Sequence, residues 1–258
     1  MAKHQHLSLK KSLGQHFLKD EQVLLQIVDE IKKTCGNLPL VEVGPGAGAL
    51  SKYFLEYPNY RLIEFDERWV AYLKEQYPTL KDKIIQKDFL QLNLDDVLTA
   101  PTAIVGNFPY NISSQILFKI LDYKDNVPFM VGMFQKEVAE RVCSPEGSKA
   151  YGIISVLLQA FYETEYLFDV PREAFNPPPK VVSGVMKMTR KSNASLPCNE
   201  QKFKSVVKLA FNQRRKTLRN SLKSMLNDNI KTLEIFDKRP EQLSVEAFVN
   251  LTNIIDWN

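Results

Sequence analysis

The sequence predicts an α/β protein in which a mostly parallel, doubly wound sheet is followed by a small all-helical domain. Short apolar runs alternate with segments of helical spacing over the first two thirds of the chain. A glycine-rich loop follows the first apolar run, and only helical spacing is found after residue 200. We therefore expect a first domain at residues 1–190, with a basic leader at 1–19, and a second domain at 191–258.

The elements of the first domain follow one another in a regular order. Residues 20–33 predict an amphipathic helix that Asp20 caps. Strands are predicted at residues 38–43, 60–65, 84–86, 102–105, 128–134 and 181–188, and further helices at 49–56, 67–76 and 137–142. Residues 153–161 are apolar on all sides, which fits a buried helix or a buried strand equally well.

The second domain begins with a polar, proline-bearing linker at residues 191–200. Residues 201–226 then show helical spacing. Two shorter helices are predicted at 230–236, capped by Asp228 or Asn229, and at 245–255, capped by Ser244.

The charges are concentrated in one part of the chain. The 258 residues carry a formal net charge of +4, but the segment from Lys187 to Arg239 holds 14 basic and 4 acidic side chains. A basic segment on a near-neutral body favours a polyanionic partner, because neutralised phosphates release counterions. A solvated helix face rich in lysine is the alternative that charge alone leaves open.

The cysteines and the apolar runs exclude several other classes of protein. Cys35, Cys143 and Cys198 lie far apart and in no paired spacing, so we expect neither a disulfide framework nor a metal site. The first residues lack the apolar run of a signal peptide, and no stretch approaches about 18 apolar residues. A cytoplasmic protein without a membrane partner is expected.

The glycine loop after the first strand predicts a nucleotide-like cofactor. Gly44 and Gly46 let the backbone approach a ligand closely, and Glu64 ends the second strand, where a carboxylate can accept both hydroxyls of a ribose. With Ala49 the glycines fit a dinucleotide fingerprint, and with Gly48 they fit the loop of S-adenosylmethionine-dependent methyltransferases. A glycine turn that only packs a helix on the sheet is the structural alternative.

The segment Asn107-Phe108-Pro109-Tyr110 is the strongest local signal. The Asn107 side-chain oxygen and the Pro109 carbonyl can accept the hydrogens of an exocyclic amine, while Tyr110 can stack on its base. Catalysis by such a site depends on positioning and electrostatics, since an amide is no general base near neutral pH. Asp88 follows the third strand, where it can accept a hydrogen bond from a cofactor adenine. An ordinary strand-ending turn is the alternative reading of this segment.

These motifs belong to an ordered series that runs nearly the full length of the chain. The series comprises KSLGQHFL (11–18), VEVGPGAGAL (41–50), GNFPYNIS (106–113), QKEV (135–138), KAYG (149–152), AFNPPPKV (174–181) and FNQRRKTLRN (211–220). The chain resembles the small-subunit (16S) ribosomal RNA adenine N6,N6-dimethyltransferases. Phe108 stands where leucine is more usual in that family.

The resemblance implies a Rossmann-like methyltransferase sheet that binds S-adenosyl-L-methionine. Cofactor contacts are then expected from His16, Leu18, Gly44, Gly46, Glu64, Asp88 and Asn107. Phe175 is expected to stack on the target adenine opposite Tyr110, although a ring packed beneath the proline loop is a serious alternative.

RNA phosphates are expected to contact the basic residues of the leader and of the second domain. These residues are Lys10, Lys11, Arg214, Arg215, Lys216 and Arg219. Part of the 214–216 group can instead pair with acidic residues of the first domain and tie the two domains together.

The resemblance implies dimethylation of two adjacent adenines near the 3′ end of small-subunit ribosomal RNA, by a monomer acting on an assembling subunit. The near alternative is a large-subunit enzyme of the antibiotic-resistance type, which would share the cofactor residues. A non-catalytic ribosome assembly factor, a DNA adenine methyltransferase and a dehydrogenase are the alternatives from other classes.

Overall fold

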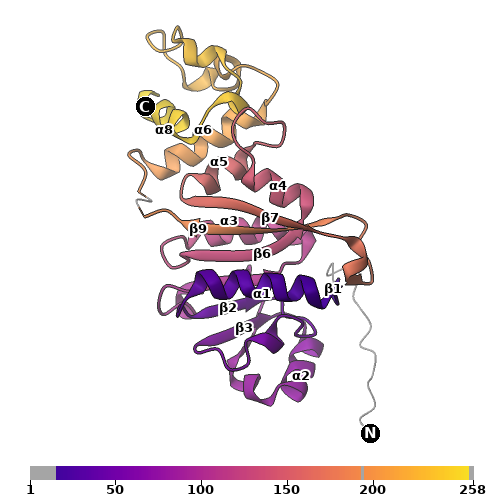
Figure 1. Cartoon of the computed structure of the whole chain (residues 1–258). Helices are drawn as coiled ribbons and strands as arrows, with labels where there is room; N and C mark the ends of the chain where they lie inside the picture. The colour runs from indigo at the N-terminus through magenta and orange to yellow at the C-terminus, as the bar shows by residue number, and fades with distance from the viewer. Residues whose placement is uncertain (1–15, 193–194, 256–258) are drawn as a thin grey trace. The chain divides into compact units, whose positions relative to one another are not determined.

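The structure is a computed structural model that describes residues 16–192 and 195–255, and a seven-stranded sheet runs through it (Figure 1). The strand order is β4-β3-β2-β5-β6-β9-β7. The strands are β2 (Leu40–Val43), β3 (Tyr60–Glu64), β4 (Ile84–Gln86), β5 (Ala103–Asn107), β6 (Phe129–Gln135), β7 (Tyr162–Val170) and β9 (Ser183–Arg190). Strands β2 to β6 pair in parallel, and β9 joins β6 in antiparallel orientation. The predicted α/β sheet is confirmed.

The strand order creates a switch point at β2. The chain leaves β2 for β3 and β4 on one side, and then returns to place β5 on the other side. Open α/β sheets bind ligands at such a point, beyond the carboxyl ends of the strands. The end of β2 leads into the glycine loop and the end of β5 is Asn107, so this topology brings the two predicted motifs to one edge.

Helices cover both faces of this sheet. Helix α1 (Glu21–Cys35) begins at Asp20, whose side chain accepts hydrogen bonds from the N–H groups of the first turn, as predicted. Its apolar stripe packs in one cluster with Val105 and Val131, while the alternate strand residues are buried on the opposite face. Figure 1 shows α1 in front of the sheet and α3 (Ser113–Asp122) behind it, and α2 (Glu67–Gln76) follows β3.

A two-stranded sheet holds the leader. Strand β1 (Phe17–Leu18) pairs in antiparallel orientation with β8 (Phe175–Asn176), so that Leu18 lies opposite Phe175. The Lys19 N–H donates to the Ala174 carbonyl at 2.8 Å and continues this attachment. The described end of the leader, residues 16–19, is therefore joined to the segment that carries the proline loop.

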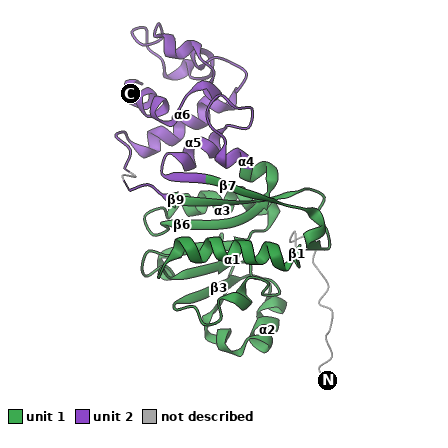
Figure 2. Ribbon diagram, viewed as in Figure 1, with its two compact units in different colours: residues 1–139, 165–189 green, residues 140–164, 190–258 purple. Residues whose placement is uncertain are grey.

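The chain forms two compact units (Figure 2). The first comprises residues 1–139 and 165–189, and the second comprises 140–164 and 190–258. The second unit differs from the expected division at residue 190 because it also includes 140–164. Its helices are α5 (Ile153–Gln159), α6 (Glu200–Asn212), α7 (Leu218–Ser221) and α8 (Val245–Ile254), while α4 (Lys136–Cys143) spans the boundary. Phe211 of α6 stacks on Phe248 of α8, with 5.8 Å between ring centroids.

Several expected elements are wrong in extent. Residues 49–56 form only a short 3-10 turn at Ser51–Tyr53, directly after the positive φ of Gly48. The helical run expected over 201–226 is interrupted after Asn212, where the chain turns to place Arg214 on two carbonyl groups. The expected helix at 230–236 is reduced to a 3-10 turn at Glu234–Asp237, because Leu233 is exposed and marks no buried face.

The expected cap of that segment is also wrong, since the side chain of Asn227, and not that of Asp228 or Asn229, accepts the local backbone N–H groups. Residues 153–161, left open between helix and strand, contain helix α5.

Within 16–192 and 195–255, every helix is too short or too polar to cross a lipid bilayer.

Candidate active site

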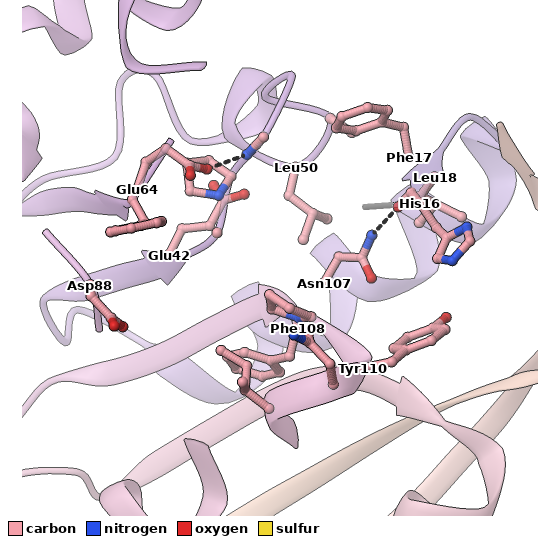
Figure 3. A pocket seen from close by; sticks show the side chains of 18 of the residues that line it. His16, Phe17, Leu18, Glu42, Leu50, Glu64, Asp88, Asn107, Phe108 and Tyr110 are labelled. Carbon is pink, nitrogen blue, oxygen red and sulfur yellow. Dashed lines mark hydrogen bonds between the residues drawn. The ribbon is translucent and has the colours of Figure 1, made fainter. Parts of the chain in front are cut away.

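A cavity of about 240 Å³ opens where the carboxyl ends of β2 and β5 meet the leader (Figure 3). Every residue predicted for cofactor binding or catalysis lines it except Phe175. These lining residues are His16, Leu18, Gly44, Gly46, Glu64, Asp88, Asn107, Pro109 and Tyr110. The structure thus gathers into one pocket side chains that are up to 94 positions apart in the sequence.

The glycine loop forms one wall of this cavity. Gly44, Gly46 and Gly48 have φ values of 69°, 53° and 79°, in the left-handed region that favours glycine. A Cβ atom on Gly46 would lie 2.7 Å from Cε1 of Phe17, so this position also needs a glycine to admit the leader ring. The loop and the leader are therefore fitted to each other.

Glu64 is fixed at the end of β3. Its Oε2 accepts from the Gly46 N–H at 3.1 Å and its Oε1 accepts from the Asp66 N–H at 2.8 Å. Burial raises the pKa of this carboxyl, although the backbone N–H groups oppose the shift. The carboxylate keeps a lone pair for a ribose hydroxyl beyond its backbone N–H partners, so the geometry fits the expected contact.

Asp88 presents a second acceptor to the cavity. Its Oδ1 accepts from the Leu90 N–H at 2.9 Å, which orients the carboxyl group. The other oxygen has no hydrogen-bond partner among the described residues, and it can accept from the amino group of an adenine.

Glu42 is a cavity residue that the sequence analysis missed. It lies in β2 and is 2 % exposed, and its Oε2 accepts from Ser51 Oγ at 2.8 Å and from the Tyr60 hydroxyl. Burial raises its pKa to about 7. An acidic residue inside an otherwise apolar strand was the signal that could have revealed it.

Asn107 has its amide orientation set by the leader. Its Nδ2 donates to the main-chain carbonyl of His16 at 3.0 Å, and a carbonyl can only accept. Figure 3 shows the nitrogen directed at the leader and the oxygen turned away from it. The Oδ1 atom accepts no hydrogen bond from the described residues, so it is open to an amine in the cavity.

The Pro109 carbonyl is partly used within its own turn. It accepts from the Ile112 N–H at 3.2 Å and lies 3.3 Å from Ser113 Oγ. Ser113 has one hydroxyl proton and also lies 3.1 Å from the Tyr110 carbonyl. When that proton goes to Tyr110, the Pro109 oxygen keeps one lone pair for an amine.

Tyr110 is held at both ends of its side chain. Its hydroxyl forms a hydrogen bond with the buried Ser183 Oγ, and its ring stacks on His16 with 5.8 Å between centroids and 28° between planes. Burial raises the pKa of the phenol, so it is neutral near pH 7. Ser183 is a second contributor that the sequence analysis missed, because it lies 73 positions away.

Phe175 does not reach the cavity. The ring is 0 % exposed and lies in the hydrophobic cluster that contains the α1 stripe. Pairing of β8 with the leader buries it, and this is the packing position that the sequence left as the alternative to stacking. No base can reach the ring in this arrangement.

The predicted RNA-binding residues have different surroundings. Lys10 and Lys11 lie outside the described residues. Arg214 donates to the carbonyls of Lys149 at 2.6 Å and Ser148 at 3.3 Å, and Arg219 pairs with Asp237 at 2.6 Å. Arg215 and Lys216 are exposed. Arg214 thus bonds carbonyl groups of its own unit and not the acidic residues of the sheet domain.

The comparisons with known proteins agree along nearly the whole chain. The family model described as ribosomal RNA adenine dimethylase matches residues 6–256. The ribosomal RNA small subunit methyltransferase A of Flavobacterium johnsoniae is 59 % identical over 250 residues, covering 96 % of this chain and 95 % of the relative. The protein of the same name from Parabacteroides distasonis is 54 % identical over 248 residues, covering 95 % and 93 %.

Solved structures support the fold. A dimethyladenosine transferase from Plasmodium falciparum superimposes with a TM-score of 0.77 at 24 % identity, covering 94 % of this chain and 100 % of that one. The 23S rRNA methyltransferase ErmE gives a TM-score of 0.69 at 23 % identity, covering 92 % and 99 %. The Rossmann-like sheet predicted from the sequence is therefore confirmed.

The cavity fits S-adenosylmethionine group by group. Glu64 suits the ribose hydroxyls, Asp88 suits the adenine amino group, and the buried carboxyl of Glu42 suits a cationic amine. Gly44 and Gly46 line the cavity, where they present main-chain atoms to a ligand. The chain belongs to the ribosomal RNA adenine dimethylase family, whose methyl donor is S-adenosylmethionine.

Proposed function

We propose that this chain dimethylates the N6 amines of two adjacent adenines near the 3′ end of small-subunit ribosomal RNA, as a step in ribosome biogenesis. The observation that carries the proposal is the Asn107 amide, whose oxygen faces the cavity beside Tyr110 while its nitrogen is held by the leader. The identity of 59 % to a small-subunit methyltransferase favours that RNA over the large-subunit one.

The side chains act by positioning the adenine amine. Bound S-adenosylmethionine supplies an electrophilic methyl group. Asn107 Oδ1 and the free lone pair of Pro109 accept the amine hydrogens, which favours a pyramidal nitrogen whose lone pair can attack. The monomethylated amine keeps one N–H, so the same acceptors serve a second transfer. Asn107 takes no proton, because an amide has no useful basicity near neutral pH, and the cationic methylated amine is acidic and loses its proton to water.

The RNA contacts come from the exposed cations. Arg215 and Lys216 are exposed and have no partner among the described residues, so they suit phosphates, and Lys10 and Lys11 extend this set from the leader. The substrate is an assembling small subunit, which a monomer of this chain modifies in the cytoplasm.

The test is methyl transfer to small ribosomal subunits that lack the modification, followed by mapping of the labelled nucleotides. We expect label on two adjacent adenines near the 3′ end, and only a slow residual transfer by Asn107→Ala. Isolated large subunits serve as the competing substrate. Preferential labelling of large subunits would support the antibiotic-resistance alternative, and normal ribosome maturation with Asn107→Ala would support a non-catalytic assembly factor.

A further inference from the structure

The orientation of Asn107 is imposed from outside its own strand. Its Nδ2 donates to the main-chain carbonyl of His16, 91 positions earlier in the sequence. Among the described residues, the Asn107 side chain forms this hydrogen bond and no other. A flipped amide would place Oδ1 against the His16 oxygen, so that two acceptors faced each other without a proton. The His16 carbonyl therefore selects the rotamer that leaves Oδ1 toward the cavity.

The His16 carbonyl is in turn held by the side chain of the same residue. The imidazole Nδ1 lies 3.0 Å from the Pro177 carbonyl, which can only accept, so Nδ1 carries the proton. The ring also stacks on Tyr110. The next two residues pair with β8, so the peptide that follows His16 is fixed on its C-terminal side as well.

We propose that His16 is a positioning residue for methyl transfer. Its imidazole, bonded to Pro177, fixes its own main-chain carbonyl, and that carbonyl orients Asn107 toward the target amine. The leader is then part of the catalytic arrangement in addition to any contact it makes with the cofactor. This inference rests on the proposed function, since it names how the acceptor of the same site is held.

Two substitutions of His16 separate the role of its Nδ1 hydrogen-bond donor from the role of its stacked ring. His16→Ala removes the donor to Pro177 and the stacked ring. His16→Asn places an amide nitrogen close to the position of the imidazole Nδ1, and so keeps the donor. We expect His16→Ala to lower kcat for methyl transfer by about 10- to 100-fold, since small misplacements of a positioned group have effects of this size. The Kd for S-adenosylmethionine should change less than about threefold, and His16→Asn should restore most of kcat.

A double-mutant cycle with Asn107→Ala tests whether His16 acts through Asn107. When the Asn107 side chain is absent, His16→Ala should cause no further loss in the slow transfer that remains. Equal losses in both backgrounds, or a fall in cofactor affinity that matches the fall in kcat, would overturn the positioning role. So would full activity of His16→Ala.

The folding of each His16 variant and its hydrogen bond from Asn107 to residue 16 are measured on the same samples. Thermal unfolding of each full-length variant verifies that it is folded, and the 15N side-chain amide signals of Asn107 report its bond to the leader. We expect His16→Ala to speed hydrogen exchange of that amide and His16→Asn to leave it slow. Full activity of Asn107→Ala would instead contradict the proposed function, so the two failures are distinguishable.

Discussion

At the scale of single residues, the buried carboxyl of Glu42 makes stability depend on pH. Its pKa is raised to about 7 in the folded protein, whereas an unfolded glutamate ionises near about 4.3. Between these values the folded state binds more protons than the unfolded state, so the free energy of unfolding falls as pH rises. We expect this carboxyl to cost on the order of 3 kcal/mol of stability above pH 7 that is absent below pH 4.

The matched control is Glu42→Gln, which has no charge to bury and keeps an oxygen for Ser51 and Tyr60. Denaturant unfolding of both proteins at pH 5 and pH 8 gives the difference that belongs to this residue. The wild type should lose stability relative to Glu42→Gln as the pH is raised. A difference that stays constant over this range would show that Glu42 is not the titrating group.

The hydrogen bond between Tyr110 and Ser183 is expected to fix the aromatic ring that we predict to stack on the target base. Tyr110→Phe and Ser183→Ala each remove one partner, and Ser183 is buried, so each leaves a polar atom unpaired. We expect each change to lower kcat by about 3- to 10-fold. The double variant should be no less active than the less active of the two single variants. Losses that multiply in the double variant would show that the two residues act separately.

At the scale of elements, the glycine loop depends on the leader. Gly46 and Gly36 both have positive φ. A Cβ atom at Gly46 would collide with Phe17, whereas a Cβ atom at Gly36 would have no neighbour within 4 Å. Gly36→Ala should therefore cost only the backbone strain, about 1–3 kcal/mol, and leave cofactor affinity unchanged. Gly46→Ala adds the displacement of Phe17 and should weaken S-adenosylmethionine binding at least about 10-fold. Isothermal titration of both variants measures this, and equal affinities would contradict the fitted contact.

The elements that the sequence predicted well are those with a strong periodic or motif signal. Helices α1 and α2 and the strands that end at Glu64 and Asn107 lie within a few residues of their expected positions. Helix α3 was not among the predicted elements, although Ile116, Leu117 and Ile120 have helical spacing. Strand β7 lies at the edge of the sheet and alternates weakly, so its pattern could not separate it from a loop.

The site was predicted as a set of residues but not as a set of contacts. Motif spacing placed Glu64, Asp88 and Asn107 at the carboxyl edge, because parallel strands end there. The bond from Asn107 to the His16 carbonyl involves a main-chain atom 91 positions away, which no side-chain pattern encodes. Burial of Phe175 follows from strand pairing with the leader, which is likewise a tertiary property.

At the scale of the whole molecule, part of the basic segment is engaged in contacts that hold the fold together. Lys187 forms ion pairs with Glu30 at 2.6 Å and Glu165 at 2.9 Å inside the first unit. In the second unit, Arg214 holds the carbonyls of Ser148 and Lys149. The local charge excess of this segment therefore overstates the number of cations that are free for a polyanion.

Arg214 and Arg215 are adjacent in the second unit, and substituting each in turn separates a structural role from RNA binding. Arg215→Ala removes an exposed cation and should weaken binding of small-subunit RNA without changing the melting temperature. The slope of log Kd against log salt concentration should fall by about 1, because one fewer phosphate is neutralised. Arg214→Ala removes the donor to two carbonyls and should lower the melting temperature, at a cost of about 0.5–1.5 kcal/mol, because water can reach the exposed Lys149 carbonyl. Filter binding over a range of salt concentrations, with thermal unfolding of each variant, decides between them. An unchanged salt slope for Arg215→Ala would place the RNA contact elsewhere on the chain.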